Sequence, residues 1–100
     1  MPTLLQFDFS MPGPWGDEMA VAFGDLAGII ERSPGLRWKI WTENEAEGIG
    51  GGIYLFEDDE SARAYLEEHT ARLEGFGVKE IRAKLLHVNE PLTEITHGPV

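Results

Sequence analysis

The order of hydrophobic periodicities along the chain restricts its fold more than any other feature. Four segments have the residue pattern of β-strands, and two have apolar residues at helical spacing. The predicted strands cover residues 3–9, 36–42, 49–56 and 78–88. The first predicted helix covers residues 17–32, and the second begins at Asp58 or Asp59 and ends before Gly75. The order βαββαβ predicts a ferredoxin-like α+β fold, in which an antiparallel sheet carries two helices on one face.

The predicted strands are apolar on both faces, which raises the question of what covers the second face. In the third strand, Ile53 and Leu55 oppose Tyr54 and Phe56. Two helices cover only one face of such a sheet, and an apolar face left bare favours association. We therefore predict a twofold homodimer in which the sheet of one copy packs on the sheet of the other.

Composition limits the domain count and the classes of partner. A length of 100 residues predicts one domain over residues 1–100, with residues 89–100 as an extended tail that is a candidate for dimer contacts. The net charge of −10 disfavours nucleic acid and anionic membranes as partners. The chain has no cysteine and its histidines lie far apart, so no metal site is expected. Neither a signal-peptide pattern nor a spanning apolar run is present, which predicts a cytoplasmic protein.

A run of glycines opens the third predicted strand, beside the strand that holds two tryptophans. Gly48 and the glycines at 50–52 precede no Lys-Ser/Thr pair and lead into a strand, which argues against a phosphate-binding loop. Glycine opposite tryptophan on adjacent strands has two interpretations. Either it lets the indole pack closely, or it leaves a hollow that a flat aromatic ligand can enter.

The two tryptophans of the second predicted strand point to opposite faces. Trp38 and Trp41 are three residues apart, and side chains alternate along a strand. Trp38 is expected to share its face with Leu36. Trp41 is expected to lie with Arg37 and Lys39, on a mixed surface suited to a rim or to a charged pocket wall.

His69 falls on the apolar stripe of the second predicted helix, so its side chain is expected to face the sheet. A histidine in this position is either a core residue with satisfied ring nitrogens or a group that moves a proton in a dry pocket. His87 in the last predicted strand and His97 in the tail are weaker candidates. The residues alone thus predict a dimeric α+β domain with an aromatic-lined space.

Several segments in combination resemble a known family. WKIWTE, GGIYLF and HTARL follow one another in this order, within a resemblance that extends from Thr3 to about Ile95. With this combination the chain resembles the YdhR-type family of small monooxygenases. The resemblance implies a dimeric α+β barrel related to cofactor-independent oxygenases of aromatic polyketides. It also implies oxidation of a polycyclic aromatic or phenolic compound by molecular oxygen, without flavin, haem or metal.

The implied chemistry needs a flat apolar slot, a group that takes or holds the phenolic proton, and exclusion of water. We expect His69 to handle the proton and Tyr54 to be the second catalytic residue. The residues expected to bind the substrate are Trp38, Trp41, Phe56 and Tyr65. We expect Trp38, Tyr54 and His69 to converge on one water-poor hollow, with a small aromatic substrate and dioxygen as the partners and no cofactor or metal.

Two other classes of function remain open from the sequence. The same hollow would suit a non-catalytic binding module for a hydrophobic aromatic metabolite, with His69 as an ordinary core residue. It would also suit a non-oxidative acid–base enzyme such as an isomerase, because one fold supports many chemistries.

Overall fold

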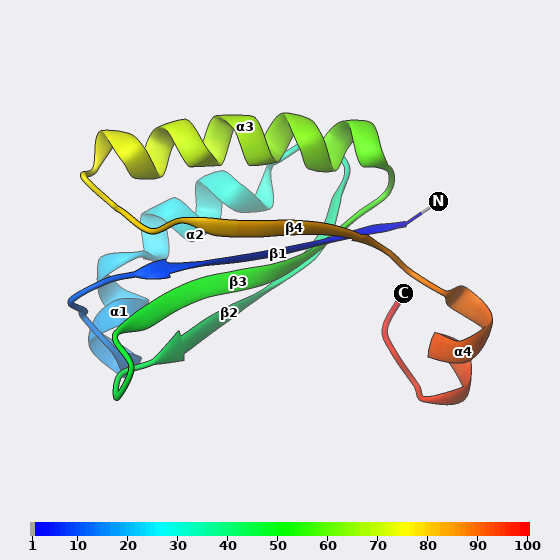
Figure 1. Ribbon diagram of the computed structural model, residues 1–100, viewed down its shortest axis with the longest axis horizontal. Coiled ribbons are helices and arrows are strands. Elements are labelled where there is room, and N and C mark those ends of the chain that lie inside the picture. The colour runs from blue at the N-terminus through cyan, green and yellow to red at the C-terminus, as the bar shows by residue number, and fades with distance from the viewer. Residues whose placement is uncertain (1) are drawn as a thin grey trace.

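The computed structural model describes residues 2–100 and contains one four-stranded antiparallel sheet. Its elements are β1 (Thr3–Ser10), α1 (Gly16–Ala22), α2 (Gly24–Glu31), β2 (Leu36–Asn44), β3 (Ile49–Phe56), α3 (Asp59–Gly75), β4 (Arg82–His87) and α4 (Glu90–Ile95). The strands lie in the order β2-β3-β1-β4. α3 runs along one face of the sheet, and α4 lies beyond the ends of the strands, at the lower right of Figure 1. The predicted α+β fold with a βαββαβ-like order is confirmed.

The core lies between the sheet and the helical layer. Leu5 and Phe7 of β1, and Tyr54 and Phe56 of β3, are each at most 1% exposed. Residues from α2 and α3 complete the same cluster, namely Ile30, Ala62, Tyr65 and Leu73. Leu5 and Phe7 share a face because alternate side chains of a strand point the same way.

The predicted helix over residues 17–32 forms two helices that meet at Phe23. The backbone N–H of Phe23 donates to the Met19 carbonyl over 2.9 Å, and Ala27 N–H donates to the Phe23 carbonyl over 2.8 Å. Helical hydrogen bonding therefore continues on both sides of the break. The break is at Phe23 itself, whose φ of −106° and ψ of 9° depart from helical values, and α2 begins at the next residue, Gly24.

A β-bulge in β2 decides which side chains of that strand reach the helices. Leu36 pairs with Phe56, whereas Trp38 pairs with Leu55, so Arg37 is an extra residue. Leu36 packs against the core on the helical side. Trp38 points to the other side of the sheet, which we call the open face. The expectation that Leu36 and Trp38 share a face is therefore wrong, because the bulge shifts the alternation.

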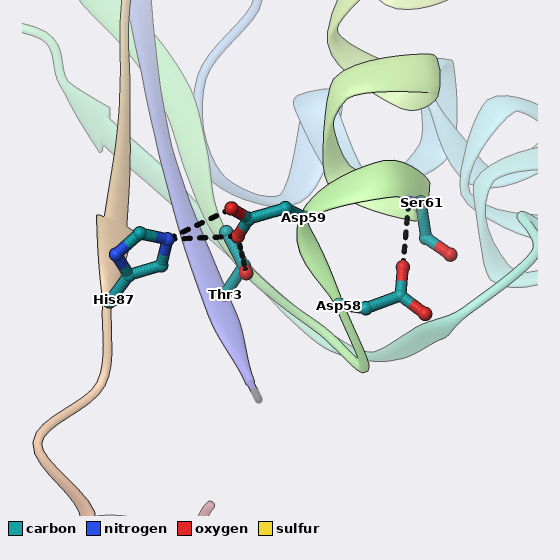
Figure 2. Close-up of polar contacts among 5 residues, drawn as sticks. All are labelled: Thr3, Asp58, Asp59, Ser61 and His87. Carbon is teal, nitrogen blue, oxygen red and sulfur yellow. Dashed lines mark hydrogen bonds and ion pairs between the residues drawn. The ribbon is translucent and has the colours of Figure 1, made fainter.

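Two aspartates fix the first turn of α3. Asp58 caps the helix by accepting from Ser61 N–H at 2.8 Å, and this backbone hydrogen bond lowers the pKa of its carboxyl. Asp59 accepts from Thr3 Oγ1 of β1 and lies 3.0 Å from His87 Nε2 of β4, as Figure 2 shows. The Thr3 hydrogen bond, followed by the His87 contact, lowers the pKa of Asp59. α3 is thereby joined to two strands.

The C-terminal part of the chain differs from the extended tail predicted over residues 89–100. The helix α4 forms there because Asn89 caps it, with its side-chain oxygen accepting from Leu92 N–H at 3.2 Å. The chain then returns to the open face, where the indole N–H of Trp38 donates to the Pro99 carbonyl over 2.8 Å. Trp38 therefore holds the C-terminal end.

The strand β4 is shorter than the strand predicted over residues 78–88. Glu80 adopts a φ of 57°, a left-handed conformation that interrupts an extended strand, and the chain joins the sheet only at Arg82. On the open face, Ile40 is 52% exposed and Leu86 is 45% exposed. The homodimer expected to cover this face stays a prediction.

Candidate functional site

A cleft of about 570 Å³ lies between the helical layer and the sheet. Its lining is mostly apolar and comes from the end of β1 with the following loop, from α1 and α2, from β2 and β3, and from α3. The lining residues with polar side chains are Asp25, Lys39, Thr42, Tyr54 and His69. An apolar hollow with a few polar groups is the usual form of a small-molecule site.

Trp41 forms one wall of the cleft near its rim. Its indole stacks on Phe23, with ring centroids 6.4 Å apart and planes 28° apart. Trp41 remains 37% exposed, so it borders both the cleft and the solvent. Because Phe23 is the residue at which α1 meets α2, the break between these helices lies beside the cleft and shapes its wall.

Gly52 provides the space in which the side chain of Lys39 lies. Gly52 pairs with Trp41 across β2 and β3. A Cβ atom on Gly52 would lie 2.7 Å from Cε of Lys39 and 3.3 Å from Cε1 of Tyr54, closer than packed carbons normally approach. The Nζ atom of Lys39 then lies 3.3 Å from the centroid of the Trp41 ring and 4.6 Å from that of Tyr54. A cation over two aromatic faces is a favourable arrangement.

Burial, followed by the positive charge of Arg72, lowers the pKa of Lys39 from 10.5 to about 7. Charged and neutral forms of the amine are therefore both present near neutral pH. An amine of this kind can exchange a proton with a bound ligand.

His69 is 3% exposed and lies among aromatic rings. It packs edge-on against Phe7 at 5.3 Å and stacks on Tyr65 at 5.1 Å. Its Nδ1 atom is 3.1 Å from Nη1 of Arg72. Because a guanidinium can only donate, Nδ1 must be the unprotonated acceptor, and Nε2 carries the proton of the ring. Burial, followed by the charges of Lys39 and Arg72, lowers the pKa of His69 to about 3. The imidazole is therefore neutral at physiological pH and offers an N–H donor.

The hydroxyls of Tyr54, which lines the cleft, and Tyr65, which does not, are hydrogen-bonded to each other. Tyr65 donates this hydrogen bond and Tyr54 accepts it, with their Oη atoms 3.1 Å apart. Burial raises the pKa of Tyr54 well above its usual value and raises that of Tyr65 to about 12. Both side chains therefore remain protonated phenols that can donate hydrogen bonds.

The structure brings only some of the predicted site residues together. Trp41, Tyr54 and His69 line the cleft, as expected. Trp38 does not, because the bulge turns its indole to the open face. Phe56 is 0% exposed within the core, and Tyr65 supports Tyr54 from behind rather than lining the cleft. The expected hollow thus exists with Trp41 at the place where Trp38 was expected.

Two residues of the site, Lys39 and Arg72, received no role from sequence reasoning. The alternation of β2 placed Lys39 with Trp41 on a mixed surface, but the contact with Gly52 depends on strand register. Arg72 follows His69 by three residues in a helix, a spacing that brings two side chains to one face. That spacing was the available signal for the hydrogen bond to Nδ1.

Among residues 2–100, no group of three or more His, Cys, Asp or Glu side chains is placed to hold a metal ion. No helix in this part of the chain has both the length and the apolar character needed to cross a membrane.

Comparison with protein families gives one finding. The model of the family described as "Putative mono-oxygenase ydhR" matches residues 4–99, which is nearly the whole chain. A search of curated proteins found no match.

Proposed function

The chain belongs to the ydhR mono-oxygenase family, and from this premise we propose that it oxidises a polycyclic phenol with molecular oxygen and without a cofactor. Membership of the family supports a general monooxygenase role. The flat phenolic substrate is supported by the cleft, in which Trp41 and Phe23 offer aromatic faces while Tyr54 and His69 offer polar groups.

The size of the cleft supports a substrate with more than one ring. Its volume of about 570 Å³ falls within the range of roughly 300–1,000 Å³ that is usual for small-molecule sites. The walls of the cleft contain more apolar than polar groups, which suits a planar hydrocarbon skeleton with few hydroxyls.

The proposed reaction needs no external reductant. The O–H bond of the phenol breaks and its electron pair stays on oxygen, which gives an electron-rich phenolate that can reduce dioxygen. One oxygen atom is then bonded to a ring carbon, and that carbon loses its hydrogen. The second oxygen atom leaves as water with this hydrogen and the phenolic hydrogen. The ring supplies the four electrons and becomes a quinone, so atoms and electrons balance.

The observation that carries this proposal is the pair of protonated donors beside the apolar walls. His69 presents its Nε2–H, because Arg72 occupies Nδ1. The Tyr54 hydroxyl also keeps its proton, since burial raises its pKa. Fixed donors that face a developing negative charge stabilise it, so these two side chains would hold the phenolate oxygen.

Oxygen consumption tests the proposal. Protein treated with chelator and confirmed free of flavin is mixed with anthrone-like compounds or dihydroxynaphthalene, and oxygen uptake is recorded with quinone formation. We expect equal amounts of oxygen consumed and quinone formed, and one labelled oxygen atom in each quinone when isotopically labelled dioxygen is used. Activity that appears only after metal or flavin is added would contradict cofactor independence.

The same assay separates the other two classes of function. Tight binding of these compounds without oxygen uptake would favour a binding module. Conversion of the compound without oxygen uptake would favour a non-oxidative acid–base enzyme, for which the same donors would suffice.

We also propose that the protein is a homodimer formed through the open face. The exposed Ile40 and Leu86 on that face support this proposal, since apolar side chains on a sheet without a covering layer favour association. The cytoplasmic location expected from the sequence stays a prediction.

A further inference from the structure

Lys39 is a cation inside an apolar cleft, and it lacks the partner that such a charge normally has. Among residues 2–100, the salt bridges are Arg72–Glu68, Arg82–Asp8 and His87–Asp59, and none includes Lys39. This is notable because the chain has eighteen acidic residues and eight basic ones. Lys39 is half-buried, and a charge drawn into an apolar cleft is usually paired, since an unpaired one is costly to remove from water.

The position of Lys39 is fixed by its neighbours, which argues against an accidental placement. Its chain runs through the space that Gly52 leaves open, and its Nζ atom lies over the rings of Trp41 and Tyr54. The charged or titratable groups around it are Arg72 and His69 on α3, Tyr54 on β3 and Asp25 on α2. The positive charge of Arg72 lowers the pKa of Lys39, so Arg72 disfavours a proton on the amine rather than holding one there.

We propose that Lys39 removes the phenolic proton of the substrate and then pairs with the phenolate, an inference that rests on the proposed function. The neutral amine accepts the proton as the O–H bond breaks, the electron pair stays on oxygen, and a new N–H bond forms. The resulting ammonium pairs with the phenolate, which is the anionic partner that none of the salt bridges among residues 2–100 provides for Lys39. The substrate class is therefore an aromatic compound with a free, ionisable hydroxyl.

The lowered pKa of Lys39 is consistent with this step, because a usable fraction of neutral amine is present near neutral pH. His69 is the less suitable base, since burial, followed by the charges of Lys39 and Arg72, lowers its pKa to about 3. The two side chains then have different tasks: Lys39 takes the proton, and the Nε2–H of His69 donates to the oxygen that has lost it.

Anaerobic binding of dihydroxynaphthalene tests the inference without any oxidation. We expect the phenolate absorption band to appear when the compound binds the wild-type protein at about pH 7, and to be lost in Lys39→Met. The dimethyl ether of the compound has no proton to give, so both proteins should bind it within about threefold of each other. Lys79→Met removes the same charge from an exposed position and should keep the band. A phenolate band of equal strength in Lys39→Met would overturn the inference.

A second variant separates the removal of the proton from the pairing with the phenolate. Lys39→Arg keeps a positive charge but has no neutral form that accepts a proton near neutral pH. We expect it to keep much of the anaerobic band while kcat/KM for oxygen uptake falls at least about 100-fold. In the wild type, kcat/KM should rise as the pH passes through about 7, and this rise should be absent in Lys39→Arg. Full activity in Lys39→Arg would overturn the role as a base.

The two proposals fail in different ways. A Lys39-dependent phenolate band without oxygen uptake would support the role of Lys39 and overturn the monooxygenase. Oxygen uptake that is unaffected by Lys39→Met would support the monooxygenase and overturn the role of Lys39.

Discussion

Burial lowers the pKa of both basic side chains of the cleft, Lys39 and His69, but the two groups differ in their chemistry at neutral pH. The pKa of His69 falls to about 3, which keeps its imidazole neutral. The pKa of Lys39 falls to about 7, where an amine is divided between its two forms. At the scale of single residues, a buried histidine is thus a donor of fixed orientation, and a half-buried lysine acquires the proton affinity usually associated with histidine.

Replacement of His69 by alanine tests its role as a donor. We expect kcat to fall about 100-fold with little change in KM, because the lost hydrogen bond forms fully only with the charged oxygen. The measurement is steady-state oxygen uptake over a range of substrate concentrations. His69→Gln keeps an N–H donor and should lose less activity than His69→Ala. Equal losses in the two variants would contradict the donor role, and unchanged turnover in His69→Ala would remove the residue from the mechanism.

The lowered pKa of Lys39 also predicts how stability depends on pH. The unfolded chain binds a proton on this lysine up to about pH 10.5, whereas the folded protein releases it near pH 7. Stability therefore rises with pH wherever the unfolded state holds more protons. We expect the free energy of unfolding to rise by about 1–2 kcal/mol between pH 7 and 9, with a flatter profile in Lys39→Met. Denaturant unfolding at several pH values measures this. If the free energy of unfolding depends on pH in the same way in the wild type and in Lys39→Met, the prediction is wrong.

At the scale of elements, the positions of the strands and of the longest helix follow from periodicity, whereas their irregularities do not. The bulge at Arg37 could not be predicted, because alternation along β2 looks regular until its pairing with β3 is known. The break at Phe23 was missed because the apolar stripe continues through it. The capping residue Asn89 could have indicated α4, but Pro91 suggested an extended tail.

The attachment of α3 to the sheet through Asp59 gives a testable consequence. We expect Asp59→Asn to lower the thermal midpoint of unfolding, because the hydroxyl of Thr3 and the ring of His87 lose a charged acceptor. The folded-state pKa of Asp59 is lowered, so its stabilising effect is present above about pH 4 and is lost on acidification below that. Thermal scans by circular dichroism at neutral and acidic pH measure both effects.

Glu60→Gln is the matched control for this prediction, since it removes one negative charge from the same exposed turn of α3. A fall in midpoint as large in Glu60→Gln as in Asp59→Asn would indicate a general effect of helix charge rather than the contact with β1 and β4.

At the scale of the whole molecule, the cleft exists because several distant segments meet. Tyr54 and His69 were predicted correctly as neighbours, since a strand face and a helix stripe that share a core must face each other. The sequence could not predict that Trp41 rather than Trp38 lines the cleft, because this depends on the strand pairing that also creates the bulge. The contact between Lys39 and Gly52 depends on the same register.

The exposed apolar side chains of the open face lead us to expect a homodimer in solution. We expect the wild-type protein to have about twice the 11.1 kDa mass of one chain in light scattering, and Ile40→Glu to shift it towards the monomer. Val21→Glu places the same charge at another exposed apolar position, 85% exposed on α1, and should leave the mass unchanged. A monomeric wild type at micromolar concentration would contradict the homodimer.

The amine that lies 3.3 Å above the Trp41 ring gives the protein an internal optical probe. A unit charge so close to an indole shifts the electronic levels from which the ring fluoresces, and the shift disappears when the amine becomes neutral. Emission from this tryptophan should therefore report the protonation of Lys39 in the native, unliganded molecule, without dye or label.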